Sequence, residues 1–255
     1  MISIIMAAYN AEKTIELAIE SVLNQTYSNF ELLVINDCSK DRTAKLVEAF
    51  SAKDNRVRLI SNEKNCGVSF TREHGLEEAK GAWIAVLDSD DAWAPEKLEK
   101  QIELQNRTNA DLLFTGSAFM DSDGRPIDWY LHAPEEVTYR QLLKQNILSN
   151  SSALVRKELY AKYYAVGDGM HEDFAIWLSI LKEGKKAYGV DEPLLIYRIA
   201  KSSKSGNKVK AAKMNWNTYR YIGLNPVEAA YYEGWYMIKN VIKYTNIKIS
   251  GGKMR

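Results

Sequence analysis

The sequence predicts an α/β fold in which a mostly parallel sheet has helices on both faces. Short apolar runs alternate with amphipathic stretches from residue 2 to residue 87, and this alternation of strand and helix patterns is typical of such a sheet. The run at residues 82–87 (AWIAVL) is apolar on both sides, as expected for a strand buried between two layers. Ligands of these sheets bind at the carboxyl ends of the strands.

The first half of the chain is regular. The predicted strands cover residues 2–8, 30–36, 57–61, 82–87 and 111–120. The predicted helices cover residues 11–25, 41–50, 68–79 and 95–106, and apolar residues in the first of them recur at the three-and-four spacing of a helix face. Residues 121–124 (DSDG) are predicted to form a tight hairpin turn.

The second half is less regular. The pattern predicts helices at residues 138–144, 156–163 and 172–182, and strands at 152–155, 186–190 and 194–199. A basic loop at 201–207 (KSSKSGN) precedes a helical hairpin at 210–221 and 226–244. We therefore expect one large domain over residues 1–205, followed by a basic, aromatic-rich helical appendage over residues 206–255.

The composition is that of a globular protein with an uneven charge distribution. Of the 255 residues, 46% are hydrophobic, and the formal net charge is +1. From Ala200 onward nine Lys and two Arg face two Glu, a net charge of +9 that leaves −8 for the rest. Cys38 and Cys66 form no disulfide framework and no metal-spaced pair, which favours a reducing compartment. With no secretory signal and no run of about 18 apolar residues, we expect a cytoplasmic protein without a membrane span.

Three carboxylates follow the buried strand directly. Asp88, Asp90 and Asp91 repel one another at the end of an apolar strand, and this arrangement costs stability. Residues two apart in extended backbone project to the same side, so Asp88 and Asp90 could converge on one ligand while Asp91 points elsewhere. Hard oxygen ligands suit Mg²⁺ or Mn²⁺. The alternative is an Asx-type turn that leads into a capped helix.

Other strand-end residues are suited to a nucleotide. Tyr9 could stack on a base, Asp37 could accept a hydrogen bond from a base imide, and Arg72 could meet a phosphate or hold a carboxylate. The sequence contains no G-x-G-x-x-G after an early strand and no G-x-x-x-x-G-K-[ST], which argues against a dinucleotide oxidoreductase and a P-loop phosphotransferase. The three histidines do not cluster, and no Ser-His-acid constellation stands out.

The chain resembles glycosyltransferase family 2, the inverting family with the GT-A fold, over residues 1 to about 205. The matching stretches are AAYNAEKTIELAIESVLNQTY (7–27), VINDCSKDRT (34–43), NCGVSFTREHGLEEAKGAWIAVLDSDDAW (65–93), HEDFAIWL (171–178) and YRIAKSSKS (197–205). Their order and spacing are specific for the family and carry little information about the sugar. The resemblance implies metal-assisted transfer of a sugar from a nucleotide-diphosphate donor, most simply a UDP-sugar, with inversion at the anomeric carbon.

The resemblance also implies roles for individual residues. Asp88 matches the first carboxylate of the D-x-D motif, near the ribose, and Asp90 matches the last, which ligates Mn²⁺ or Mg²⁺ on the diphosphate. Asp173, in the Glu172–Asp173 pair that opens a helix, matches the general base, and we expect the helix dipole to favour its ionised form. The uracil site and the phosphate loop supply the remaining donor-binding matches, at Tyr9, Asp37, Arg72 and Arg198.

Two departures from the family pattern are visible. Cys38 stands where the family usually has glycine, and the loop from Arg198 to Ser205 lacks the histidines that some members carry. Arg198, Lys201, Ser203 and Lys204 are the substitutes in that loop. The chemistry agrees with the layout, because transfer by inversion needs one base and a neutralised leaving group rather than a pair of catalytic carboxyl groups.

Plainer structural interpretations remain open for these residues. Tyr9 could be a packing aromatic, Asp37 a turn or helix cap, and Arg72 the partner of Glu73, Glu77 or Asp88. Glu172 could only cap its helix, His171 could line the site or be solvated, and Trp177 fits a core position.

The appendage and the function class also leave alternatives. An amphipathic, basic helix with interfacial aromatics could lie on an anionic membrane surface at the inner face of the cytoplasmic membrane, or pack on the preceding domain with its lysines solvated. No nucleic-acid motif accompanies the basic residues. We expect a hexosyl- or N-acetylhexosaminyl-transferase that acts on a glycan or lipid-linked acceptor in the assembly of surface polysaccharides such as lipopolysaccharide. The alternatives are a non-catalytic nucleotide-sugar-binding partner and a nucleotidyltransferase.

Overall fold

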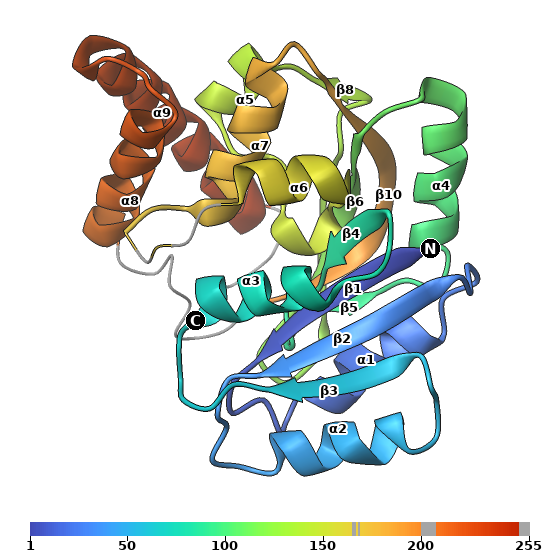
Figure 1. Cartoon of the computed structure of the whole chain (residues 1–255). Helices are drawn as coiled ribbons and strands as arrows, with labels where there is room; N and C mark the ends of the chain where they lie inside the picture. Colours follow the sequence, from blue (N-terminus) through green and yellow to red (C-terminus); the bar gives the residue numbers. More distant parts are fainter. Residues whose placement is uncertain (165–166, 168, 200–207, 250–255) are drawn as a thin grey trace.

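The computed structural model describes residues 1–164, 167, 169–199 and 208–249, and Figure 1 shows how its helices surround one sheet. The first half alternates as predicted. The strands are β1 (Ile2–Ala8), β2 (Phe30–Asn36), β3 (Val57–Ser61) and β4 (Trp83–Val86), and the helices between them are α1 (Ile15–Leu23), α2 (Thr43–Ser51) and α3 (Val68–Glu78). The strands contain continuous apolar runs and pair in parallel, because each connecting helix returns the chain to the same edge of the sheet.

The topology reverses between β1 and β4. The sheet order is β3-β2-β1-β4-β9-β6-β10-β5, so the chain builds outward from β1 to β3 and then crosses back to place β4 on the other side of β1. Ile2 is paired with Phe30 of β2 and with Trp83 of β4. A ligand site in an open parallel sheet lies where the strand order reverses, at the carboxyl ends of the strands.

The second half turns the sheet into a mixed one. Strand β9 (Leu154–Arg156) runs antiparallel to both β4 and β6 (Leu112–Met120), whereas β6 and β10 (Ala187–Arg198) are parallel. The other elements are β5 (Ala92–Trp93), α4 (Lys97–Thr108), β7 (Pro126–Leu131), β8 (Glu136–Val137), α5 (Tyr139–Lys144), a 3₁₀ turn (Asn150–Ser152), α6 (Lys157–Tyr163) and α7 (Glu172–Lys182). The predicted hairpin turn at 121–124 joins β6 to β7, and Gly124 in it has a φ of 83°.

One strand replaces two predicted ones. Residues 186–190 and 194–199 were expected to form separate strands, but β10 runs continuously from Ala187 to Arg198. Its register against β6 shifts on both sides of Pro193. Proline has no N–H to donate to a ladder and is accommodated at a bulge, so the pairing resumes beyond it along the same partner strand. The two-residue strands β5 and β8 were too short to give a periodic signal.

The core has two layers, one on each face of the sheet. Helices α1, α2 and α4 bury their apolar side chains on one face, and α3, α5, α6 and α7 bury theirs on the other. Trp177 of α7 is fully buried, which confirms the core position that its sequence pattern favoured. Both faces of the first strands are therefore covered, and the residues that follow their carboxyl ends form the accessible rim of the sheet.

The last two helices share this core. Helices α8 (Lys208–Tyr221) and α9 (Pro226–Ile249) pack against α7 and α5. Tyr219 and Ala229 have no exposed surface, and Tyr219 donates a 2.6 Å hydrogen bond from its hydroxyl to the carbonyl of Leu143. The junction of α8 and α9 is therefore buried against the preceding helices. Within the part of the chain that the structure describes, no helix combines the length and apolar content needed to cross a bilayer.

Candidate active site at the carboxyl edge of the sheet

The loops that follow β1 and β2 are tied together at the carboxyl edge. The Asn10 backbone N–H donates to Ser39 Oγ at 3.0 Å, and Lys40 N–H donates to Asn10 Oδ1 at 2.8 Å. Tyr9 projects from this pair of loops with 50% of its surface exposed. A ring must be exposed in this way if it is to stack on a ligand. Cys38 has a φ of 58°, in the left-handed region. That conformation explains why glycine is usual at this position, since glycine adopts it without a steric cost.

Asp37 is buried and holds the loop that leads into α3. Its carboxylate accepts hydrogen bonds from the N–H groups of Cys66 and Gly67 and from Asn62 Nδ2, at distances between 2.8 and 2.9 Å. Burial alone would raise the pKa of Asp37, but these hydrogen bonds outweigh it and lower the pKa below its ordinary value. Asp37 therefore stays ionised and fixes the start of the helix that carries Arg72.

Arg72 links the loop after β4 to the start of α7, which lies 100 residues along the chain from Arg72 itself. Its Nη2 donates to Asp88 Oδ1 at 2.5 Å, and its Nη1 pairs with Glu172. The side chain is buried; burial alone would lower its pKa, but the charges of Asp88 and Glu172 raise the pKa well above its ordinary value. The guanidinium therefore remains charged and joins the first D-x-D carboxylate to the start of α7. Of the partners that the sequence left open for Arg72, Asp88 is found, and Glu172 is an additional one.

The three carboxylates of the loop from Asp88 to Asp91 differ in their surroundings. Asp91 is buried and accepts the backbone N–H of Arg198 through Oδ1 at 2.9 Å, which ties it to the end of β10. Asp90 is half-buried, and burial followed by the charge of Asp88 raises the pKa of its carboxyl group. Because Asp90 has no ion-pair partner among the described residues, a bound cation would relieve this unfavourable charge.

Arg198 and Ser151 hold that loop in place. Arg198 Nε donates to the carbonyl of Asp90 at 2.8 Å, and its Nη1 lies 3.4 Å and 3.3 Å from the carbonyl oxygens of Asp121 and Ser122. The guanidinium expected to meet donor phosphate is thus engaged with backbone carbonyls. Ser151 Oγ accepts the Asp88 N–H at 3.2 Å. Ser151 was missed in the sequence, where the run Asn-Ser-Ser carries no periodic or spacing signal.

Glu172 and Asp173 open α7 beside this loop. The Glu172 side chain pairs with Arg72, so Glu172 does more than cap its helix. Burial raises the pKa of Asp173, the Phe174 N–H, His171 and Arg72 oppose the rise, and the charge of Asp88 adds to it. The helix dipole favours the ionised form, but the pKa is raised all the same because loss of hydration at this site is the largest effect. A raised pKa makes a carboxylate a stronger proton acceptor.

The structure thus brings six of the eight candidates into one connected cluster. Direct contacts join Asp88, Arg72 and Glu172, and Arg198 contacts Asp90, while the charge of Asp88 acts on both Asp90 and Asp173. Tyr9 and Asp37 follow the neighbouring strands β1 and β2 at the same edge. The phosphate loop was predicted from Arg198 to Ser205, and its residues from 200 onward lie outside the described residues.

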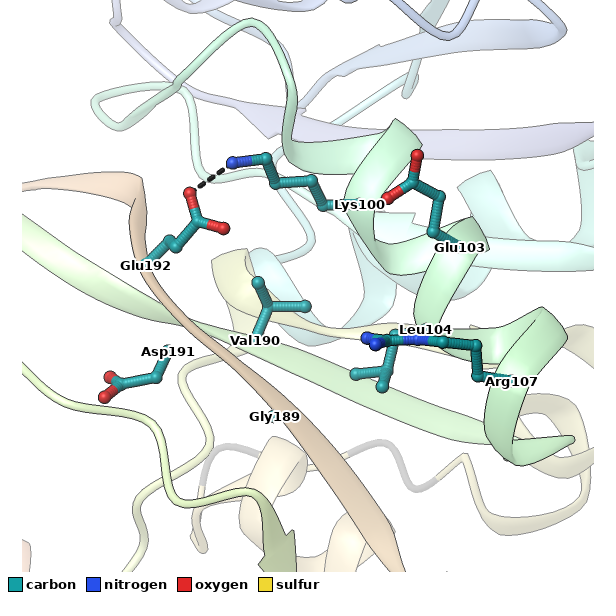
Figure 2. Close-up of a pocket in the computed structure, with 8 residues that line it drawn as sticks. All are labelled: Lys100, Glu103, Leu104, Arg107, Gly189, Val190, Asp191 and Glu192. Carbon is teal, nitrogen blue, oxygen red and sulfur yellow. Dashed lines mark hydrogen bonds and ion pairs between the residues drawn. The ribbon is translucent and has the colours of Figure 1, made fainter.

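A shallow groove elsewhere on the surface contains none of these residues. Figure 2 shows it between α4 and β10, with the Lys100–Glu192 ion pair at one end and Arg107 at the other. Its wall from β10 consists of Gly189 to Glu192, in the middle of the strand rather than at its carboxyl end. The candidate site is therefore assigned to the strand ends.

Solved structures share this fold. The chain matches Staphylococcus aureus TarS 1–349 in complex with UDP-GlcNAc with a TM-score of 0.71 and 21% identity, covering 89% of this chain and 69% of that chain. It matches the mannosyltransferase PcManGT from Pyrobaculum calidifontis, in complex with GDP-Man and Mn²⁺, with a TM-score of 0.69 and 15% identity, covering 92% and 68%. The fold is that of the GT-A glycosyltransferases.

The sequence comparisons define the family. The model for glycosyl transferase family 2 matches residues 3–163. The putative teichuronic acid biosynthesis glycosyltransferase TuaG of Bacillus subtilis is 38% identical over 87% of this chain and 88% of its own length. WfgD of Escherichia coli, named as a UDP-Glc:alpha-D-GlcNAc-diphosphoundecaprenol beta-1,3-glucosyltransferase, is 36% identical over 96% and 95%. The chain belongs to glycosyltransferase family 2, so it is a glycosyltransferase and the predicted family and fold are confirmed.

Proposed function

We propose that the protein transfers a sugar from a UDP-sugar to a hydroxyl of a glycan or lipid-linked saccharide, with inversion, in the assembly of a surface polysaccharide. The observation that carries the proposal is the Arg72 bridge, which sets the donor-side carboxylate Asp88 beside the Glu172–Asp173 pair. The names of the relatives add support, because WfgD is named for a UDP-Glc donor and a diphosphoundecaprenol-linked acceptor, and a solved TarS structure contains UDP-GlcNAc.

The donor nucleotide would lie across the ends of β1 and β2. Tyr9 is exposed and available to stack on uracil. Asp37 would accept a hydrogen bond from a base imide through its ionised carboxylate, which the N–H groups of Cys66 and Gly67 hold in place. Asp88 would accept from a ribose hydroxyl through the oxygen that Arg72 does not hold.

A divalent cation fits beside Asp90. The part of the chain that the structure describes contains no group of three or more metal-ligating side chains. Mg²⁺ or Mn²⁺ bound through diphosphate oxygens and water needs only one or two protein carboxylates, so Asp90 is sufficient. The solved mannosyltransferase structure contains Mn²⁺ with its nucleotide sugar. When bound, the cation would neutralise charge on the leaving diphosphate.

Asp173 would act as the general base. It would take the proton from the attacking acceptor hydroxyl as that oxygen bonds to the anomeric carbon and the bond to the diphosphate breaks. Its raised pKa supports this role. Arg72 would hold both Glu172 and Asp88 in ion pairs. Asp173 would then be the carboxylate beside them that is left to accept a proton.

The outer face of α9 is proposed to rest on an anionic membrane surface. Val227, Tyr231, Trp235 and Ile238 recur at intervals of four and three residues, so they share one face of the helix, and each is between 38% and 79% exposed. We name this set the α9 stripe. Lys144 places its Nζ 5.3 Å from the centre of the Trp235 ring, which adds positive charge beside the stripe. Aromatic, aliphatic and basic groups on one face are typical of helices that lie in a membrane interface.

Asp173→Asn is the variant that tests the activity. Asparagine has nearly the same shape but cannot accept the proton. The experiment measures UDP binding and the transfer of glucose from UDP-glucose to a short-chain GlcNAc-diphospholipid. Other UDP-sugars then replace UDP-glucose as the donor, one at a time. We expect unchanged UDP binding with turnover reduced by about 10²-fold or more. Full turnover in the variant would exclude Asp173 as base, and UDP binding without turnover in the wild type would favour a non-catalytic binding protein.

A further inference from the structure

We propose that Thr218 and Asn217 of α8 are positioning residues that hold the general base in place. This inference rests on the proposed role of Asp173. The two side chains contact the backbone of the segment that immediately precedes α7, rather than any group expected to meet substrate. The C-terminal helical pair would then be a working part of the active site, where the sequence alone suggested a separate appendage.

The contact at Thr218 is direct. The backbone N–H of His171 donates to Thr218 Oγ1 at 3.0 Å, and the same hydroxyl donates to the carbonyl of Met214 at 3.0 Å. Thr218 is fully buried, so water cannot replace its hydroxyl. His171 is the cap residue of α7, and its carbonyl accepts the N–H of Ala175 at 3.0 Å. Thr218 therefore fixes the peptide from which the first turn of α7 begins.

Asn217 makes a second contact to the same segment. Its Nδ2 donates to the carbonyl of Gly169 at 2.7 Å, two residues before His171. Ser69 of α3 makes contacts just before this segment, where Gly167 N–H donates to Ser69 Oγ at 3.3 Å and the Tyr164 hydroxyl donates to the Ser69 carbonyl at 2.6 Å. Both α3 and α8 therefore contact the described residues that lead into α7.

Helix α7 also packs against α8 and α9 through Phe174, the residue that follows Asp173. The ring of Phe174 lies 5.9 Å from that of Tyr219 in α8 and 6.0 Å from that of Tyr236 in α9, centre to centre. Phe174 is fully buried, so rotation of the first turn of α7 would disrupt this aromatic packing. Contacts from α8 and α9 thus set the position and orientation of Asp173.

Thr218→Val tests the proposal, because it removes the hydroxyl and preserves the shape of the side chain. Catalytic groups tolerate displacements of only about 0.5 Å, so we expect kcat to fall about tenfold or more with the KM for the UDP-sugar changed by less than about twofold. Thr218→Ser restores the hydroxyl and should recover most of kcat. Asn217→Ala, at a half-buried polar side chain, is a second variant that leaves the apolar core unchanged.

Lys182→Met is the matched control. Lys182 Nζ donates to the Ile222 carbonyl at 2.7 Å, which ties the last residue of α7 to the residue that follows α8. Its loss should lower the melting temperature and leave kcat unchanged. The assay uses purified full-length protein, UDP-glucose or the UDP-sugar that the wild type turns over, and the GlcNAc-diphospholipid acceptor, with UDP binding as a check of folding.

The outcomes are distinct. The proposal is supported if kcat falls in Thr218→Val and Asn217→Ala. Thr218→Ser should then recover kcat, and Lys182→Met should keep the wild-type kcat. Wild-type kcat in both Thr218→Val and Asn217→Ala, or an equal loss in Lys182→Met, overturns it. If Asp173→Asn is inactive while Thr218→Val and Asn217→Ala are normal, only the positioning inference fails. If Asp173→Asn turns over like the wild type, the proposed base fails and the inference fails with it.

Discussion

Arg72 Nη2 lies 2.5 Å from Asp88 Oδ1, and this contact joins the two halves of the candidate site. Asp88 follows the buried strand β4, while Arg72 lies on α3 and uses its other amino group to pair with Glu172 at the start of α7. One buried guanidinium thus pairs with two carboxylates, Asp88 on the proposed donor side and Glu172 beside the proposed base Asp173. The geometry of the site depends on this residue more than on any other single side chain.

Replacement of Arg72 by Met should destabilise the protein by about 3 kcal/mol, near the lower end for breaking a buried ion pair. The lower end applies because the Asp88 side chain is 37% exposed and can be partly rehydrated, whereas that of Glu172 is only 12% exposed. Urea unfolding measures the change. Arg56→Met is the control, since its pair with Asp54 is nearer the surface and should cost less than about 1 kcal/mol. Equal losses in the two variants would contradict the account.

Activity should fall as the pH is lowered, with the fall centred above the ordinary Asp value. The pKa of Asp173 is raised by burial, so its carboxylate takes up a proton at a higher pH than a solvated Asp and can no longer accept one from the acceptor. The profile of kcat/KM against pH reports the ionisation of this group in the free enzyme. An acid limb centred at or below 3.8, the ordinary value, would contradict it.

The same shift predicts a pH dependence of stability. Between the ordinary and the raised pKa the folded state binds more protons than the unfolded state, so the contribution of Asp173 to the free energy of unfolding decreases as the pH rises. Asp173→Asn lacks this ionisation. Unfolding in urea should therefore show the variant gaining stability relative to the wild type as the pH rises above 3.8, the ordinary Asp value. A stability difference that does not change as the pH rises above 3.8 would exclude the raised pKa.

The carboxyl-edge residues could be predicted from the sequence because they follow strands directly. Tyr9, Asp37 and Asp88 come just after apolar runs, and parallel strands place their ends at one edge. The Arg72–Glu172 pair and the Thr218 contact could not, because each joins residues 47 or more positions apart and leaves no periodic signal. Pro193 split the pattern of β10 in the sequence without breaking the strand, since only the register against β6 changes there.

The α9 stripe should bind anionic vesicles. Tyr231→Ser and Trp235→Ser together remove two interfacial rings, and we expect sedimentation with vesicles of phosphatidylglycerol and phosphatidylcholine to weaken by about tenfold. Phe70→Ser, at an exposed ring on α3, is the control and should sediment like the wild type. Vesicles of phosphatidylcholine alone should bind less, because the basic groups near the stripe then have no charge to meet. Equal sedimentation of the wild type and the double variant would exclude the α9 stripe as the contact.

The most direct test of the central claim is UDP release from a panel of UDP-sugars with Mn²⁺, comparing the wild type with Asp90→Asn. Asp90 is the proposed cation ligand, and its asparagine variant keeps the shape of the side chain while losing the charge. The account predicts that one donor is turned over by the wild type and that the variant loses this activity by about 10²-fold or more. Equal UDP release by the two proteins, or no binding of UDP by the wild type, would contradict it.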